Sequence, residues 1–401
     1  MAATLSPPSS LEPLAAAVCG AAALPLEQAV ALPAAAYFDP SLYAWELEHL
    51  FRRRWVCVAH ASQLPRPGDY MNVDLAGEPM VVVRGKDGVL RVLSRACMHR
   101  GMDIMPAGFG RPPRGNTRVL LCPYHYWGYE LDGKLKGAPE MHKARDFDRD
   151  CVGLHEHRSA TWEGFVFVNL TGDAPPLEPQ LEELRAKFLH RWELGTAVVV
   201  WEKLWPSPFN WKVLVENFME AYHHLGSHAK TLQPVLPAQG CFAEPSHDAY
   251  AAVHLPIRAD LLSQSDGGRG LTALRPFAGM AAEDFREWWV FLAYPNHLLF
   301  TAPDRVYWYR FLPTGPESGE LLTTMLVDPA ALAEPGFEHA CAREAQLLVD
   351  VHTEDVEACT GVQRGLRAAG YRPGRLSHLE EPVWQIQRWL AARLREAGLG
   401  R

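Results

Sequence analysis

The chain of 401 residues has no long run of basic residues and only eight cysteines. It also lacks any run of about 20 apolar residues, which excludes a transmembrane helix. Nucleic-acid surfaces need clustered Lys and Arg, so the formal net charge of −8 without a basic run argues against a nucleic-acid partner. Eight cysteines are too sparse for a disulfide scaffold in a chain of this length. We therefore expect a cytoplasmic protein with neither a membrane nor a nucleic acid as partner.

The N-terminal residues 1–36 are rich in Ala and Pro and carry no Lys or Arg before their apolar part. Pro, Glu and Gln also interrupt them, which favours a flexible leader over a signal peptide. Residues 37–55 have the pattern of an amphipathic helix. Asp39 or Ser41 is the expected cap, Pro40 suits the first turn, and we assign this helix to the catalytic part of the chain.

The remaining chain changes from a β pattern to a mixed pattern. Residues 56–170 contain short strands separated by turns, such as the GKDG turn within 80–94. Residues 171–197 form a Pro-rich linker and a helix. Residues 198–401 combine strands with helices, the longest over roughly 336–369. The expected fold class is α+β, with a small antiparallel β domain inserted before a larger domain of antiparallel sheet plus helices.

The β domain contains two Cys/His pairs, Cys97-x-His99 and Cys122-x-x-His125. A structural zinc bound by two cysteines and two histidines is one interpretation. Zinc fingers usually group the cysteines and then the histidines, whereas here each loop supplies one of each. That alternation suits a two-iron cluster, in which one iron takes both cysteines and the other takes both histidines. We therefore predict a Rieske [2Fe–2S] cluster, with zinc as the alternative.

The residues beside these pairs resemble those of a Rieske domain. Arg100-Gly101 and Trp127 stand where such domains have CxHRG and CxxHxW. Two features depart from the pattern. The gap between the pairs is longer than the common one, which suggests a surface insertion, and Tyr126 stands where Gly is customary.

A second group of metal-binding residue types lies in NWKVLVENFMEAYHHLGSH, residues 210–228. Glu220 and His223 are three apart, which places them on one face of a helix. His223 and His228 are five apart, so a continuous helix would separate them by about 140°. Gly226 allows the helix to end between them, and His228 can then fold back toward His223. Two such histidines are part of an iron site that still needs a carboxylate.

The long helix supplies a carboxylate for this site. Six positions spaced three or four apart form one stripe that is apolar except for a single acid: Leu348, Val351, Asp355, Cys359, Val362 and Leu366. A buried lone carboxylate is costly, and a metal ion is one partner that offsets the cost. We therefore predict Asp355 as the third metal ligand beside His223 and His228. Glu354, expected on the solvent side, and Asp350 are the fallbacks.

Three other features have more ordinary interpretations. Glu220 is expected to support a ligand histidine, because the three ligands are complete without it. His224 alone is more often a packing or hydrogen-bonding histidine. The aromatic residues in 286–300 and 305–311 would suit an aromatic ring or, by cation–π attraction, a quaternary ammonium group. An ordinary β core is nevertheless the better interpretation of most of them.

Over nearly its whole length the chain resembles the α (oxygenase) subunit of Rieske non-haem iron ring-hydroxylating oxygenases. The resemblance rests on CMH…CPYH, on ENFMEAYHHLGSH and, more weakly, on EDVEACTGVQRGL. It implies a Rieske domain before a helix-grip catalytic domain that holds one mononuclear Fe(II). It also implies a homotrimer in which Glu220 joins the cluster of one subunit to the iron of the next, and it matches Asn217 to an Asn near the iron.

The resemblance implies an oxygenase that takes electrons from a reductase or ferredoxin and uses O₂ to hydroxylate or oxidatively demethylate a small organic substrate. Breakdown of aromatic hydrocarbons is one such role. A Rieske electron carrier without a mononuclear iron and a zinc-stabilised binding protein are the alternatives. The sequence leaves open the substrate, the choice between one and two inserted oxygen atoms, and the presence of a β subunit.

Overall fold

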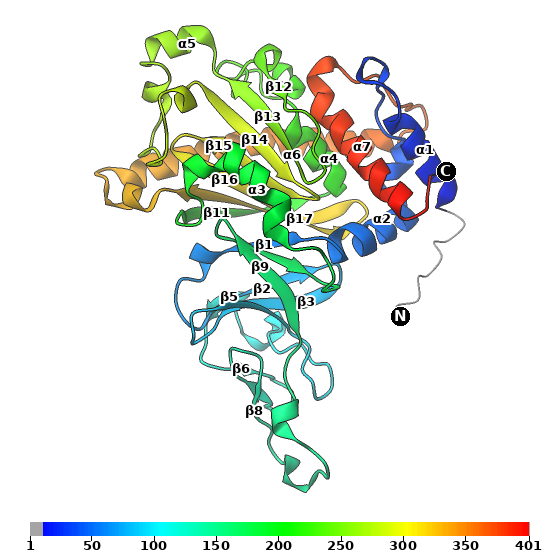
Figure 1. Ribbon diagram of the computed structural model, residues 1–401, viewed down its shortest axis with the longest axis vertical. Helices are drawn as coiled ribbons and strands as arrows, with labels where there is room; N and C mark the ends of the chain where they lie inside the picture. Colours follow the sequence, from blue (N-terminus) through cyan, green and yellow to red (C-terminus); the bar gives the residue numbers. More distant parts are fainter. Residues whose placement is uncertain (1–10, 401) are drawn as a thin grey trace. The chain divides into compact units, whose positions relative to one another are not determined.

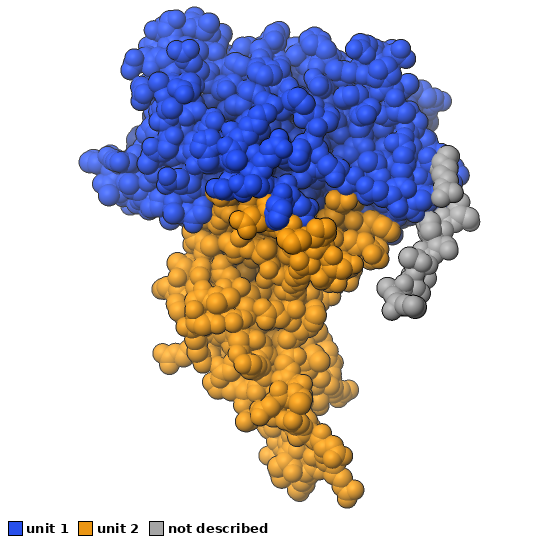
Figure 2. All heavy atoms as spheres, viewed as in Figure 1, with its two compact units in different colours: residues 1–47, 179–401 blue, residues 48–178 orange. Residues whose placement is uncertain are grey.

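The computed structural model describes residues 11–400, which divide into two compact units (Figure 1, Figure 2). Within the described residues, unit 1 comprises 11–47 with 179–400, and unit 2 comprises Glu48–Glu178. The sequence predicted a β domain over 56–170, so unit 2 extends beyond it at both ends. Among the described residues no helix is both long enough and apolar enough to cross a bilayer.

Unit 2 is built from antiparallel strands (Figure 1). Its larger sheet has the order β1 (Val56–His60), β10 (Phe165–Asn169), β9 (Glu156–Trp162), β4 (Leu90–Ser94), β3 (Glu78–Arg84), β2 (Asp69–Leu75) and β5 (Arg114–Asn116). A smaller sheet comprises β6 (Leu120–Leu121), β7 (Gly128–Tyr129) and β8 (Leu135–Gly137). The hairpin predicted within 80–94 lies in the larger sheet as β3 and β4. Val81 and Val83 share one apolar core with the two predicted cluster cysteines, so this core supports the loops that carry them.

Unit 1 contains a second antiparallel sheet of seven strands. Its order is β11 (Val198–Ser207), β17 (Ser318–Val327), β16 (Arg305–Gly315), β15 (His297–Ala302), β14 (Glu287–Ala293), β13 (Tyr250–Pro256) and β12 (Phe242–Ala243). Most aromatic residues of β14 and β16 are buried in this sheet, as expected; Trp289, Phe291 and Trp308 are at most 5% exposed. β-strands favour such residues because large side chains pack well on a pleated surface.

Helices pack on this sheet. The helices of the described chain are α1 (Glu12–Ala22), α2 (Pro40–Glu46), α3 (Leu177–Lys187), α4 (Trp211–Met219), α5 (Ala259–Gln264), α6 (Phe337–Leu366) and α7 (Glu381–Glu396). α4, α6 and α7 each contact strands of the unit 1 sheet. Asp39 caps α2 by accepting hydrogen bonds from the backbone N–H groups of Ser41 and Leu42. Three antiparallel sheets, with helices packed on the sheet of unit 1, confirm the predicted α+β class.

The N-terminal segment corrects one prediction. Residues 1–36 were expected to form a flexible leader, but Glu12–Ala22 is an α-helix that packs against α7. Ala15, Val18 and Cys19 are buried on its inner side. Alanine is the best helix former, and its small side chain lets two helices approach closely. The Ala-rich composition therefore supports a docked helix, while residues 1–10 lie outside the described part of the chain.

Candidate metal centres

The two Cys/His pairs of unit 2 lie in tight loops after β4 and β6. Cys97 and Cys122 are 3% and 1% exposed. The rings of His99 and His125 lie side by side, with centroids 4.7 Å apart. The structure thus brings the four predicted cluster ligands together, each loop contributing one thiol and one imidazole.

The surroundings of these residues fit an iron–sulfur cluster. Nδ1 of His99 is buried and has no hydrogen-bond partner among residues 11–400. Such an atom is rare and costly unless a partner satisfies it, which an iron would do. Burial raises the pKa of the Cys122 thiol, and the neighbouring Cys97 adds to this. Two buried thiols held against each other therefore favour a cationic partner that binds both as thiolates.

Tyr129 contacts the cluster loops directly. Its hydroxyl lies 3.1 Å from Sγ of Cys97 and accepts a hydrogen bond from the backbone N–H of Met98 at 3.0 Å. A thiolate sulfur can only accept, so when Cys97 ligates iron the Tyr129 hydroxyl donates to it. Sequence reasoning did not identify this residue, because an ordinary strand tyrosine carries no motif.

Tyr126, which replaces the customary Gly, has a φ of +60° and is 65% exposed. This left-handed conformation costs roughly 1–2 kcal/mol for a residue with a Cβ, whereas Gly adopts it freely. The loop therefore keeps the backbone shape that Gly would take. The backbone N–H of Tyr126 donates a hydrogen bond to the carbonyl of Cys122 at 3.1 Å.

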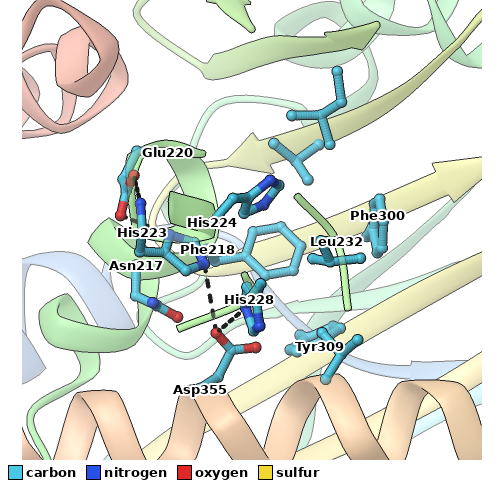
Figure 3. Close-up of a pocket in the computed structure, with 13 residues that line it drawn as sticks. Asn217, Phe218, Glu220, His223, His224, His228, Leu232, Phe300, Tyr309 and Asp355 are labelled. Carbon is cyan, nitrogen blue, oxygen red and sulfur yellow. Dashed lines mark hydrogen bonds and ion pairs between the residues drawn. The ribbon is translucent and has the colours of Figure 1, made fainter. Parts of the chain in front are cut away.

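The predicted iron ligands of unit 1 also meet. One ligand atom from each of His223, His228 and Asp355 lies within 4.8 Å of the others (Figure 3). Oδ1 of Asp355 is 3.0 Å from Nε2 of His228 and 3.6 Å from Nε2 of His223. Ligands of one ion at about 2.1 Å lie about 3 Å apart on an octahedral face. The donor set and its spacing fit a mononuclear iron.

The chain reaches this arrangement differently from the prediction. A helix was expected to continue through His223 and end at Gly226, but α4 ends at Met219. Glu220 is extended, with ψ of 157°, and a short 3-10 helix, Tyr222–Leu225, follows. Glu220 therefore meets His223 across a helix end rather than along one helical face. Its Oε1 accepts from Nδ1 of His223 at 2.7 Å, and its Oε2 accepts from the His223 backbone N–H at 3.0 Å.

The long helix α6 also departs from the predicted stripe. Asp355 is buried as expected, but Val362 is 52% exposed and Gln363 is buried in its place. Glu354, expected on the solvent side, accepts hydrogen bonds from His228 and Thr231. The reason is tertiary: the turns after Gly226 cover this part of the helix, which no periodicity within α6 reveals.

Charges at the site follow from these contacts. Burial alone would raise the pKa of Asp355, but His228, His352 and His223 hold it well below its usual range. Burial also opposes charge on His228, yet hydrogen bonds to Asp355 and Glu354 raise its pKa. His224, 4% exposed, has its pKa lowered to about 3, first by burial and then by His223.

His224 is therefore neutral, and its Nδ1 bonds to the carbonyl of Leu236 at 2.9 Å. This matches the expected hydrogen-bonding histidine, although its ring also borders a cavity. That cavity opens beside the three ligands and encloses about 420 Å³ of space, part of it open to solvent. The side chains that line it are those of Asn217, Phe218, Glu220, His223, His224, His228, Leu232, Leu255, Val290, Phe300, Tyr309, Val351 and Asp355 (Figure 3). Phe300 and Tyr309 thus belong to the cavity wall as well as to the sheet.

Comparison with known proteins bears on both centres. The family model of the Rieske [2Fe–2S] domain matches residues 54–148. The model of the ring hydroxylating alpha subunit (catalytic domain) matches residues 186–396, more than half of the chain. Both predicted cofactors, a [2Fe–2S] cluster and a mononuclear iron, are those of these two domains. The first match favours the iron–sulfur interpretation over zinc.

Curated relatives include the carnitine monooxygenase oxygenase subunit of Escherichia coli K12, which is 36% identical over 198 residues, or 49% of this chain and 52% of that protein. The biphenyl 2,3-dioxygenase subunit alpha of Rhodococcus jostii RHA1 is 36% identical over 50% of this chain and 44% of its own length. The aligned part thus spans about half the length of these two relatives. The glycine betaine monooxygenase oxygenase subunit of Chromohalobacter salexigens is 26% identical over 87% of this chain and 82% of its own length.

Solved structures show the same fold. A quaternary ammonium Rieske monooxygenase aligns with a TM-score of 0.77 at 23% identity, covering 94% of this chain and 97% of that one. Naphthalene 1,2-dioxygenase from Rhodococcus sp. aligns with a TM-score of 0.71 at 22% identity, covering 90% and 94%. With the family model spanning most of unit 1 and a Rieske model spanning most of unit 2, the chain belongs to the family of ring hydroxylating alpha subunits, the Rieske non-haem iron oxygenases.

Proposed function

We propose that the chain is an oxygenase component that uses O₂ and electrons from a reductase or ferredoxin to oxidise a small organic substrate. The observation that carries this proposal is the convergence of His223, His228 and Asp355 in a chain that also carries a Rieske domain. A pure electron carrier would have no use for the second centre, and the family match to the catalytic domain also argues against it.

Residues of this chain have distinct roles in the proposed reaction. When bound, the iron supplies O₂ activation and the cluster supplies electrons one at a time. Glu220 accepts a hydrogen bond from Nδ1–H of His223 and so directs Nε2 toward Asp355. Phe218, Leu232 and the other apolar side chains of the cavity exclude water from the substrate. Asn217 stands at the same cavity, where it can bond to a bound substrate.

For the substrate, we propose a quaternary ammonium or methylated amine compound. Rings of Phe218, Phe300 and Tyr309 line the cavity. Aromatic faces attract a cation that cannot donate hydrogen bonds. Relatives named for carnitine and glycine betaine support this class.

An aromatic hydrocarbon is the second candidate. The cavity wall also carries Leu232, Leu255, Val290 and Val351, which suit an uncharged ring. A relative named for biphenyl dioxygenation supports it. The two classes give different products: hydroxylation of a carbon bonded to nitrogen leads to cleavage of that C–N bond into an aldehyde and an amine, and ring dioxygenation yields a dihydrodiol.

The test is O₂ consumption by the purified chain with its cluster and a generic reductase, across a panel of quaternary amines, methylated amines and aromatic compounds. We expect uptake with at least one panel member, coupled to a product of one of these two types. His223→Ala is the matched control and should keep the cluster colour while losing turnover. Full turnover by His223→Ala would contradict the function.

Assembly and location complete the proposal. We propose a homotrimer in which Glu220 also receives a hydrogen bond from a cluster histidine of a neighbouring subunit, as the family resemblance implies. Sedimentation analysis tests the trimer. We propose a cytoplasmic location, supported by the eight cysteines, none of which is paired in a disulfide.

A further inference from the structure

Glu354 lies beside the predicted iron site but is absent from the cavity lining. It stands next to Asp355 on α6, and its side chain is 33% exposed. Its Oε2 accepts a hydrogen bond from Nδ1 of His228 at 2.7 Å and another from the hydroxyl of Thr231 at 2.6 Å. One oxygen of the Glu354 carboxylate therefore bonds both to the predicted ligand His228 and to Thr231, which follows His228 by three residues.

The position of His228 explains why such a support matters. His223 lies in a 3-10 helix, whereas His228 lies in the turns that follow Gly226. Within that segment the backbone carbonyl of His228 accepts from the N–H groups of Thr231 and Gln233, at 3.2 and 3.0 Å. These bonds fix the backbone but do not by themselves set the orientation of the imidazole, which is buried at 1% exposure. The ring orientation thus depends on what its own nitrogens meet.

We propose that Glu354 is a positioning residue that fixes the ring of His228 with Nε2 toward the iron, and that Thr231 acts by holding Glu354. The inference rests on the proposed function, because it takes His228 as an iron ligand. A bond from Nδ1–H to Glu354 selects the tautomer whose Nε2 carries a lone pair, and an anionic acceptor makes that nitrogen a better donor to a metal.

Each of the two predicted ligand histidines then donates a hydrogen bond from Nδ1 to a glutamate, and the two glutamates come from different parts of the chain. Glu220 accepts from Nδ1 of His223 at 2.7 Å, and Glu354 accepts from Nδ1 of His228 at 2.7 Å. Glu220 precedes its histidine by three residues, whereas Glu354 is 126 positions from His228. The Glu354 contact therefore also ties the loop that bears His228 to the helix that bears Asp355.

The test measures Fe(II) affinity of the full chain with its cluster intact, by competition with a chelator and by iron counted per chain. Four single variants and one double variant are compared with the wild type: Glu354→Ala, Glu354→Gln, Thr231→Val, Glu357→Gln and Glu354→Ala/Thr231→Val. Glu357 is an exposed acid three residues further along the same helix, so Glu357→Gln makes the same chemical change away from the site. Cluster absorbance and the unfolding temperature check the fold of each variant.

We expect Glu354→Ala to weaken Fe(II) binding by about 10- to 100-fold and Glu357→Gln to leave it unchanged. Glu354→Gln should restore most of the loss, because its carbonyl oxygen can accept both hydrogen bonds. Thr231→Val should have a smaller effect and none on top of Glu354→Ala, since Thr231 acts only through Glu354.

Wild-type Fe(II) affinity in Glu354→Ala, or in Glu354→Leu should the alanine variant not fold, would overturn the positioning role. An additive Thr231→Val effect would overturn the role given to Thr231. These results differ from a failure of the proposed function, in which the wild type itself binds no iron beyond the cluster.

Discussion

Oδ1 of Asp355 lies 3.0 Å from Nε2 of His228, although 127 positions separate the two residues in the chain. The same oxygen is 3.6 Å from Nε2 of His223. An ionised carboxylate thus faces two imidazole nitrogens at the edge of a cavity that apolar side chains also line. A two-histidine, one-carboxylate set with open sides is the arrangement that non-haem Fe(II) oxygenases use.

Replacing Asp355 by alanine should remove the mononuclear iron and leave the cluster in place. The reason is that two neutral imidazoles alone bind Fe(II) weakly, and the anionic ligand is lost. Iron and acid-labile sulfide analysis of Asp355→Ala checks this, with turnover expected to fall by roughly 100-fold or more. Asp350→Ala, an exposed position on the same helix, is the control. Unchanged iron content in Asp355→Ala would contradict the ligand assignment.

Tyr129→Phe should lower the reduction potential of the cluster, by roughly tens of millivolts. The hydroxyl, 3.1 Å from Sγ of Cys97, stabilises the extra electron of the reduced state when it donates to the thiolate. Redox titration followed by visible absorption or electron paramagnetic resonance measures the shift. An unchanged potential in a variant with a normal cluster spectrum would show that this hydrogen bond does not tune the cluster.

Tyr126→Gly should stabilise unit 2 by about 0.5–1 kcal/mol, because Gly relieves the left-handed strain while adding unfolded-state entropy. The tyrosine side chain is 65% exposed, so little packing is lost. Thermal unfolding and the rate of cluster bleaching measure the effect. Tyr124→Gly serves as the control: it lies two residues away without a positive φ, and its ring packs on His125, so its loss should destabilise.

Lys212→Met should lower the free energy of unfolding by about 3–5 kcal/mol. Nζ of Lys212 lies 2.5 Å from Oε1 of Glu46, and the two side chains are 1% and 0% exposed. Removing the lysine leaves a buried carboxylate whose remaining side-chain donor is Nε1 of Trp211. The double variant Glu46→Gln/Lys212→Met should be less destabilised in denaturant titrations. A change below about 1 kcal/mol for Lys212→Met would contradict the buried pair.

Glu216 makes stability fall as the pH rises. Burial raises its pKa from 4.5 to about 7, while the hydrogen bond from Tyr37 and the charge of Lys212 oppose that rise. Between these values the folded chain holds a proton that the unfolded chain has released. Its contribution is therefore full below about pH 4.5 and is lost by about pH 7. Relative to wild type, Glu216→Gln should gain about 3 kcal/mol over this range in denaturant titrations. A difference independent of pH would refute this.

Local patterns account for the parts of the fold that were predicted well. The helix expected over 336–369 is observed as Phe337–Leu366, and the hairpin within 80–94 is observed as β3 and β4. Both follow from periodicity over short windows, in which each residue reports on its neighbours. The same locality produced the errors. Helical periodicity predicted that the helix continues beyond Met219, where α4 in fact ends. It also placed Val362 in the apolar stripe of α6, although this side chain is exposed.

The sequence by itself determined which residue types were available for two metal centres, because each cluster loop and the His223/His228 pair are encoded within a few consecutive positions. The family assignment follows from the same motifs and is confirmed by the family models. Only the tertiary structure decided that Glu354 meets His228, that Lys212 pairs with Glu46 and that Glu12–Ala22 docks on α7. The two side-chain contacts join residues 126 and 166 positions apart, and no local pattern specifies which distant element a side chain will meet.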